Sequence, residues 1–211
     1  MGIASVKGLS PKEADKKESI ATLKQILSQL PKEKKSADER ALEEQVLYNL
    51  VGLSSQTTNW ADTEKYSRLY LDNRHSKKAA EMSYLFAVSF DKRGKSEDAI
   101  RFYSLVYGSY AGFLELSVPS IERIVELTWK RNLKQGAKVG DAVLKVDDRQ
   151  AAYEAGANFI RRTKKSMEDD GVPDEIKNEI RGVAALVKKY EDSGEVKTLA
   201  EQAAEKNKRT R

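Results

Sequence analysis

The 211-residue chain has no cysteine and a single histidine, His75. Disulfides, thiolate metal sites and a cysteine nucleophile are therefore excluded, and a transition-metal site would need carboxylate ligands alone. Phosphate-binding signatures are missing too, because residues 136–140 lack the spacing and the Lys-Ser/Thr ending of a P-loop. No Gly-x-Ser-x-Gly elbow is present for a nucleophilic serine. We therefore expect a protein that is not an enzyme and that binds no cofactor and no metal.

Long apolar runs are absent as well. No stretch approaches the roughly 20 residues that span a bilayer, and residues 1–10 lack the hydrophobic region of a secretory signal. We therefore expect a soluble chain without a transmembrane segment. Glycine and proline are scarce, at 12 and 4 residues, whereas good helix formers are plentiful. An apolar fraction of 39% with a charged fraction of 34% favours an elongated helical protein over a compact enzyme.

Two stretches of the chain match each other at an offset of 36 residues. Repetition with a period between 20 and 50 residues is typical of a solenoid of stacked units, and a solenoid usually provides a binding surface. Apolar residues fall on apolar residues, and aromatic residues fall on aromatic residues. The matched pairs are Tyr48 and Tyr84, Leu50 and Phe86, Val51 and Ala87, Asp62 and Asp98, Tyr66 and Phe102, and Leu69 and Leu105.

Apolar spacings of three and four residues predict an all-α chain of about eight helices, with no strand. Ser36 and Glu39 form a capping box, Gly94 is suited to a helix C-terminus, and Asp147 is a candidate cap. Ser10 and Pro11 mark the first helix start. The expected helices are residues 10–30, 37–55, 60–71, 77–93, 96–110, one beginning after Pro119, 148–167 and 173–192. A charged tail follows at 193–211, which we expect to be frayed or disordered, with a turn or two of helix at 199–204 left open as an alternative.

Residues 80–111 resemble a tetratricopeptide repeat. The matching positions are Phe86, Ala87 and Phe90 in the first helix, Gly94 at the turn, and Ala99, Tyr103 and Val106 in the second helix. The departures are Ser83 in place of the usual Trp, Ser96 in place of an aromatic residue and Ala111 in place of the closing Pro. The preceding repeat carries Thr58 at the glycine position and Thr63 at the small-residue position.

The resemblance implies a right-handed α-solenoid of antiparallel helix pairs. Its domain would cover residues 10–192, with residues 1–9 as a disordered segment or tag and 193–211 as a charged tail. Each helix pair would bury its apolar faces only by stacking on its neighbours. The implied parts are an N-terminal capping helix at 10–30, repeats at about 37–73 and 76–111, a degenerate repeat at 118–168 and a capping helix at 173–192.

In this family the first helices of successive repeats line a concave groove. Tyr48 and Tyr84 would set two phenol rings along it, and tyrosine is a common interface residue. The alternative is that both rings pack against the next helix. The resemblance implies a non-catalytic module that binds a peptide or helical segment of a partner protein. Carried over by position, the groove residues are Gln45, Tyr48, Gly52 and Ser55 in one repeat and Glu81, Tyr84, Val88, Asp91 and Lys92 in the next.

The segment 70–80 resembles repeats of bacterial cell-envelope proteins, of the outer-membrane-assembly lipoprotein and Tol-Pal coordinator kind. This favours a second hypothesis, in which the chain is a structural scaffold or self-association segment of a larger envelope protein. The compartment would be the periplasm or cell envelope if a signal or anchor was removed, and otherwise the cytoplasm.

A third hypothesis, a basic binder of nucleic acid or lipid surfaces, is less favoured. The net charge is only +5, and the basic clusters are not interleaved with the aromatic residues that stack on bases. The clusters are Lys130, Arg131, Lys134 and Lys138, and Arg161, Arg162, Lys164 and Lys165.

Overall fold

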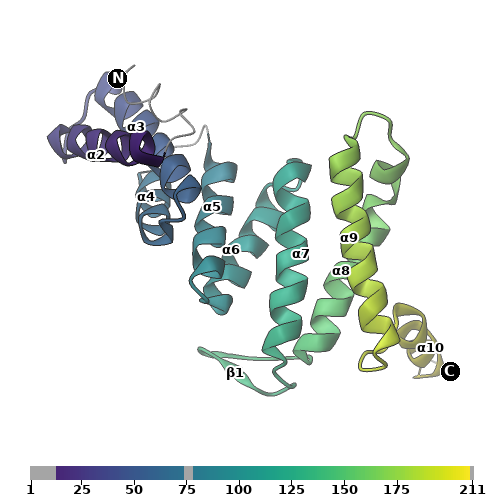
Figure 1. The fold of residues 1–211 in the computed structure, drawn as a ribbon. Coiled ribbons are helices and arrows are strands. Elements are labelled where there is room, and N and C mark those ends of the chain that lie inside the picture. The colour runs from purple at the N-terminus through teal and green to yellow at the C-terminus, as the bar shows by residue number, and fades with distance from the viewer. Residues whose placement is uncertain (1–12, 74–77, 210–211) are drawn as a thin grey trace. The chain divides into compact units, whose positions relative to one another are not determined.

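The computed structural model describes residues 13–73 and 78–209, and these residues form an all-α structure (Figure 1). Within them, the only strands form a two-residue antiparallel pair, β1 (Lys138–Val139) and β2 (Ala142–Val143). The expected helix start at Ser10 and Pro11 lies outside the described residues, as does His75. The nine helices in this described part are α2 (Glu13–Gln29), α3 (Ala37–Gln56), α4 (Trp60–Asp72), α5 (Ala79–Lys92), α6 (Ser96–Ser109), α7 (Leu114–Arg131), α8 (Asp148–Glu168), α9 (Asp174–Asp192) and α10 (Leu199–Arg209).

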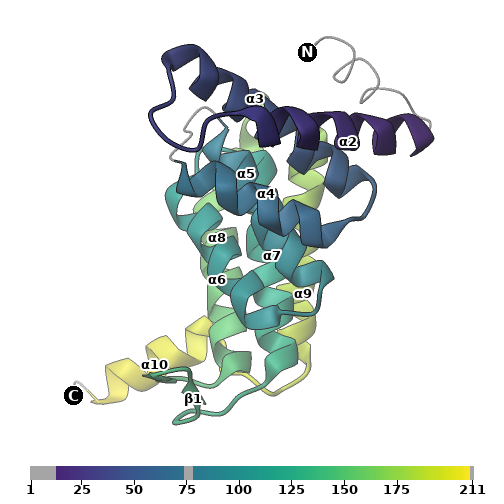
Figure 2. The same ribbon diagram turned by 90° about the vertical axis from the view of Figure 1, so that its left-hand side faces the viewer.

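The chain divides within α6 into two compact units, Met1–Phe102 and Tyr103–Arg211. In the first unit each described helix packs on the next: α2 on α3, α3 on α4 and α4 on α5. The alternate helices α3 and α5 also touch, and Figure 2 shows α2 lying across α3. One apolar cluster joins α2, α3, α4 and α5, and its buried residues include Leu23, Leu47, Leu50, Tyr70 and Met82. The amphipathic helices thus bury their apolar stripes against one another.

The 36-residue repeat is visible in the pattern of burial. Nine buried residues of α3 and α4 each match a buried residue of α5 or α6, although the residue types differ. Thr63 and Ala99, at the small-residue position, are both 0% exposed, so α4 and α6 each bury a small side chain at the equivalent point. The pairs are Val46/Met82, Leu47/Ser83, Leu50/Phe86, Val51/Ala87, Leu53/Ser89, Ser54/Phe90, Thr63/Ala99, Ser67/Tyr103 and Tyr70/Val106.

The turns that end α3 and α5 are also equivalent. Each has the two backbone hydrogen bonds of a Schellman motif, which requires a left-handed residue just after the helix. That residue is Gly94 (φ 72°) after α5 and Thr58 (φ 55°) after α3. The bonds, 2.8–3.0 Å long, run from Asn59 N–H to Ser54 O and from Thr58 N–H to Ser55 O, and from Lys95 N–H to Phe90 O and from Gly94 N–H to Asp91 O.

In the second unit α7, α8 and α9 all pack on one another. Trp129 of α7 stacks on Tyr190 of α9, with ring centroids 3.6 Å apart. Gly156 lets α8 approach α9 closely, because a Cβ at this position would lie 2.5 Å from Cγ2 of Val187. Arg131, the last residue of α7, forms a bidentate ion pair with the buried Asp148, at 2.7 and 2.8 Å. This pair joins the end of α7 to the start of α8.

Several sequence-based expectations need correction. Helix α7 begins at Leu114, five residues before Pro119, because a first turn forms ahead of the proline and Pro119 removes only one helical hydrogen bond. The loop around residues 136–147 contains the hairpin of β1 and β2. Asp147 stands at the N-cap of α8 without capping it, since its carboxylate accepts the N–H of Gln135 instead.

The C-terminal segment was expected to be frayed, but residues 199–209 form α10. Thr198 and Glu201 form a capping box in which each side chain accepts the other's backbone N–H, at 2.7 and 3.2 Å. The Thr-x-x-Glu spacing was the signal that could have predicted this helix start.

In the described part of the chain, none of the helices combines the length and apolarity that crossing a membrane requires.

Candidate binding surface on α3 and α5

The nine predicted groove residues lie on α3 and α5, two helices in contact within the first unit. None of the nine is buried: Gln45 and Lys92 are exposed, and the other seven are half-buried. The residues between them on the same helices, such as Leu47, Leu50 and Phe86, are the buried ones. Each helix therefore has one face in the core and the other on what we call the α3–α5 surface, made of these nine residues.

Tyr48 and Glu81 are brought together across the two helices. The Tyr48 hydroxyl lies 3.2 and 3.3 Å from the two carboxylate oxygens of Glu81 and donates to them. Burial, together with the negative charge of Glu81, raises the pKa of Tyr48. The ammonium of Lys78 lies 5.8 Å from the centre of the Tyr48 ring, within range of a cation–π contact. The ring also packs against the core cluster of the first unit.

The Tyr48 side chain thus lies partly in the core and partly at the surface, and its role in binding stays a prediction. Part of its ring packs inside the protein, and the rest is held at the surface by Glu81 and Lys78. A ring that is already fixed loses little conformational entropy when a partner covers it.

Tyr70 and Glu44 fix the start of α5. The Tyr70 hydroxyl donates to the Glu44 carboxylate at 2.7 Å and accepts the backbone N–H of Lys78 at 3.1 Å. Tyr70 is 0% exposed, and burial followed by the Glu44 hydrogen bond raises its pKa. One buried hydroxyl thus connects α3, α4 and the N-terminus of α5. Sequence reasoning missed the roles of Glu44, Tyr70 and Lys78, because their contacts join residues that are far apart in the chain.

Gly52 leaves a gap in the side chains of this surface. Apart from its chain neighbours and the local backbone of α3, a Cβ built on Gly52 would meet no described atom within 4 Å, so there is open space beside this position. Its repeat equivalent on α5 is Val88, which is half-buried. At four-residue spacing, Tyr48 and Gly52 of α3 and Tyr84 and Val88 of α5 make up what we call the apolar strip, and the surface also carries the acidic residues Glu81 and Asp91.

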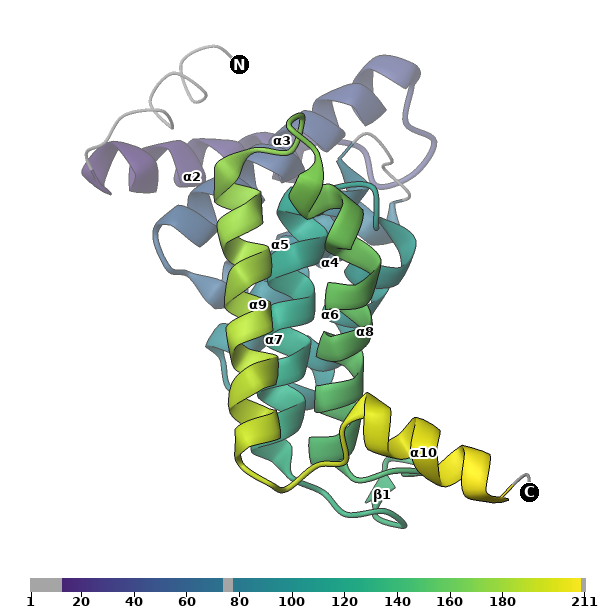
Figure 3. The same ribbon diagram turned by 90° about the vertical axis from the view of Figure 1, so that its right-hand side faces the viewer.

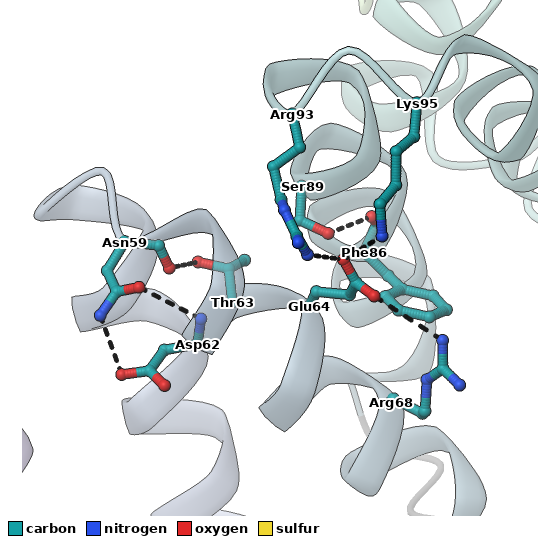
Figure 4. Close-up of polar contacts among 9 residues, drawn as sticks. All are labelled: Asn59, Asp62, Thr63, Glu64, Arg68, Phe86, Ser89, Arg93 and Lys95. Atoms are coloured by element: carbon teal, nitrogen blue, oxygen red, sulfur yellow. Dashed lines mark hydrogen bonds and ion pairs between the residues drawn. The ribbon is translucent and has the colours of Figure 1, made fainter.

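Ion pairs link α4 to α2 and to the turn that follows α5. The Glu64 carboxylate accepts hydrogen bonds from Arg93 and from Lys95, which lies 3.3 Å away on the turn between α5 and α6 (Figure 4). Arg68 contacts the same carboxylate at 3.8 Å. In the same way Lys24 of α2 binds Asp62 at 2.7 Å. These contacts link α4 to α2 on one side and to the turn after α5 on the other.

The structure changes the interpretation of the first basic cluster, which is made of Lys130, Arg131, Lys134 and Lys138. Arg131 is engaged by the buried carboxylate of Asp148, and the Lys134 ammonium lies 3.8 Å from Asp147. Lys130 and Lys138 are exposed. Two of the four cations thus face carboxylates in their own chain, which lowers the positive charge available to a phosphate. The four cations of the second cluster, Arg161, Arg162, Lys164 and Lys165, are all exposed on α8.

Across residues 13–73 and 78–209, no three His, Asp or Glu side chains gather in a way that could hold a metal ion. No known protein family, curated protein or solved structure matches this chain. The inference of function therefore rests on the residues of the chain itself.

Proposed function

We propose that this chain is a non-catalytic protein–protein interaction module. In this proposal it is a right-handed α-solenoid of the tetratricopeptide type, and the α3–α5 surface binds a peptide or helical segment of a partner protein. The observation that carries the proposal is the pairing of α3 and α5. Two repeat-equivalent helices lie in contact and bury equivalent residues, and they leave all nine predicted groove residues unburied.

The chemistry of the surface indicates what it would bind. Tyr48 and Tyr84 provide apolar area and hydroxyl groups, and the open space beside Gly52 admits a side chain or a helix from the partner. Glu81 and Asp91 add negative charge to the same surface. A segment with apolar side chains flanked by Lys or Arg would complement both features.

Gly52 and the two tyrosines allow a direct test. Gly52→Arg places a long charged side chain in open space, where it blocks the surface without a clash inside the protein. Gly52→Ala is the matched control, because it changes the same position and adds only a methyl group. Tyr48→Ala combined with Tyr84→Ala removes both rings, and Tyr110→Ala removes a half-buried tyrosine of the second unit.

The assay has two stages. Immobilised wild-type chain captures proteins from an extract of the source organism, and calorimetry then measures each purified partner against the variants. Losing two interface tyrosines should cost about 2–4 kcal/mol, a loss of affinity of roughly 30-fold or more. Gly52→Ala and Tyr110→Ala should bind as the wild type does. Equal affinity for all variants, with unchanged helicity by circular dichroism, would overturn the proposal.

A second candidate function, self-association within a longer scaffold, is favoured by a different observation. Leu69 of α4 and Leu105 of α6 occupy equivalent repeat positions, and they are 37% and 47% exposed. Repeated exposed leucines are suited to packing against a further helical layer. Sedimentation equilibrium measures this directly. A mass that rises with concentration and falls back in Leu69→Lys and Leu105→Lys variants supports self-association, and a constant monomer mass contradicts it.

A further inference from the structure

The connection between α9 and α10 contacts the start of α8 in an ordered way. Residues 195–198 have no helical structure, and residue 199 opens α10. Figure 3 shows this connection passing from the end of α9 to the side of α8, after which α10 leads away. Every second residue of 195–199, here called the 195–199 segment, meets a side chain of α8. The three contacts are Arg149 with the Glu195 carboxylate, Gln150 with the Lys197 backbone and Tyr153 with the Leu199 backbone.

Gln150 binds the backbone of Lys197 rather than its side chain. The side-chain amide donates from Nε2 to the Lys197 carbonyl at 3.0 Å, and its Oε1 accepts the Lys197 N–H at 2.8 Å. One amide thus satisfies both backbone groups of a single residue, as a neighbouring β-strand does. Such a contact accepts any residue with a free N–H at this position. It is a general way to hold a linear peptide.

Arg149 adds selectivity for an acid. Its guanidinium lies 5.1 Å from the centre of the Trp129 ring, so the ring fixes its position, and it forms an ion pair with Glu195. The Arg149 cation therefore favours a ligand with Asp or Glu two residues before the one held by Gln150.

The 195–199 segment does not fill the space beside it. A cavity of about 420 Å³ lies between this segment and the connection from α7 to α8, and Val146, Gln150 and Val196 are among the residues that line it. Val146 is 43% exposed. A ligand with a larger apolar side chain at the position of Val196 would cover more apolar surface than the chain's own segment does.

Release of this segment would require few changes. Its three contacts with α8 described above are hydrogen bonds and an ion pair. The Glu195 side chain is 44% exposed, so the ion pair contributes little in water. Residues 200–208 of α10 are exposed except for Gln202. The capping box of Thr198 and Glu201 lies within the segment and helix themselves, so α10 keeps its own start signal after release.

We propose that the first two turns of α8 form a peptide-binding site that the 195–199 segment occupies in the free protein. A linear peptide of a partner protein, with a carboxylate two residues before the clamped position, displaces this segment. The site lies in the second unit and involves none of the α3–α5 surface, so the two proposals stand or fall separately.

The test uses the full chain and a fluorescein-labelled synthetic peptide with the sequence of residues 193–203. In the full chain, Glu195→Ala combined with Lys197→Pro removes the ion pair and the N–H that binds Gln150, so the chain's own segment is released. Fluorescence anisotropy then measures peptide binding. We expect at least tenfold tighter binding to this double variant than to the wild type, because the attached segment competes at a high effective concentration.

Three further variants make the test specific. Adding Gln150→Ala to the double variant should abolish binding, whereas adding Arg162→Ala, an exposed change elsewhere on α8, should not. A peptide with Lys in place of Glu195 should bind more weakly, because it places a like charge against Arg149, and adding Arg149→Glu should restore its binding. The proposal is overturned if the double variant, with wild-type helicity and thermal unfolding, does not bind the peptide. Binding that does not depend on Gln150 overturns it equally.

Discussion

The left-handed turn at Thr58 yields the sharpest prediction about stability. Thr58 and Gly94 hold equivalent places in equivalent Schellman turns, with φ of 55° and 72°. Thr58 is exposed, and no side-chain hydrogen bond of Thr58 is among those found in the described residues. Its backbone N–H and C=O make the turn contacts. Exchanging the residue types between the two turns therefore changes backbone preference and almost nothing else.

The magnitude follows from two opposing effects. A non-glycine residue pays about 1–2 kcal/mol for the left-handed conformation, and glycine loses about 0.5–1 kcal/mol more backbone entropy on folding. Thr58→Gly should therefore stabilise the protein by about 0.5–1 kcal/mol. Gly94→Thr should destabilise it by a similar amount, since the space around Gly94 is open and no clash adds to the cost. Thr58→Ala should be near neutral, because alanine meets the same left-handed penalty.

Urea unfolding followed by tryptophan fluorescence provides the assay. Trp60 and Trp129 are the two tryptophans, and one lies in each unit. In a Trp129→Phe background the emission therefore reports on Trp60, two residues from Thr58. The urea midpoint should shift while the slope stays constant. The reasoning fails if Thr58→Gly matches Thr58→Ala, or if Gly94→Thr leaves the midpoint unchanged.

Three further predictions concern packing, pH and a buried hydroxyl. Gly156→Ala should destabilise the protein, because the clash with Val187 costs about 1–3 kcal/mol. Gly52→Ala should instead stabilise it by up to about 1 kcal/mol. Equal urea midpoints for the two variants would contradict the close approach of α8 to α9 at Gly156. Burial acts to raise the pKa of Asp148, but the hydrogen bonds from Arg131 and from the Leu133 N–H lower this pKa overall. The ionised Asp148 therefore contributes to the stability of the fold above pH 3.8, and this stability is lost as pH falls through the lowered pKa. Asp148→Asn should therefore destabilise the protein by about 2–4 kcal/mol at pH 7. The difference in thermal unfolding temperature between wild type and variant should become smaller below about pH 4, and a difference that does not depend on pH would refute this. Ser67→Ala should stabilise by about 1 kcal/mol, because the Ser67 hydroxyl is buried without a partner in the described structure, and calorimetry showing a loss would contradict it.

Most of the helix positions could be read from the chain, because their signals are local. The capping box at Ser36 is present as predicted, with hydrogen bonds of 2.7 and 3.2 Å. The spacing of apolar residues also identified the core-facing sides of α3 and α5, and so predicted which residues remain for a surface. The start of α7 was misplaced because Pro119 was read as a boundary, whereas the helix forms a turn ahead of it.

The candidate site could be predicted only as a set of positions. The repeat indicated that Tyr48 and Tyr84 occupy equivalent faces, but not that Tyr48 would bond to Glu81, 33 residues away. The contact between Gln150 and Lys197 joins residues 47 positions apart, and no local sequence pattern predicts it. Such partners depend on how the helices pack, and side-chain type alone leaves many pairings open.

The sequence by itself determined the all-α class, the 36-residue repeat and the residues that face the core, because helix propensity, caps and amphipathic spacing act within a few residues. Only the tertiary structure decided which polar groups from distant parts of the chain meet. It forces Thr58 into a left-handed turn and buries Asp148 against Arg131. It also seats the 195–199 segment on α8. Each of these arises where packed helices bring distant residues within hydrogen-bonding distance or require a turn of fixed shape.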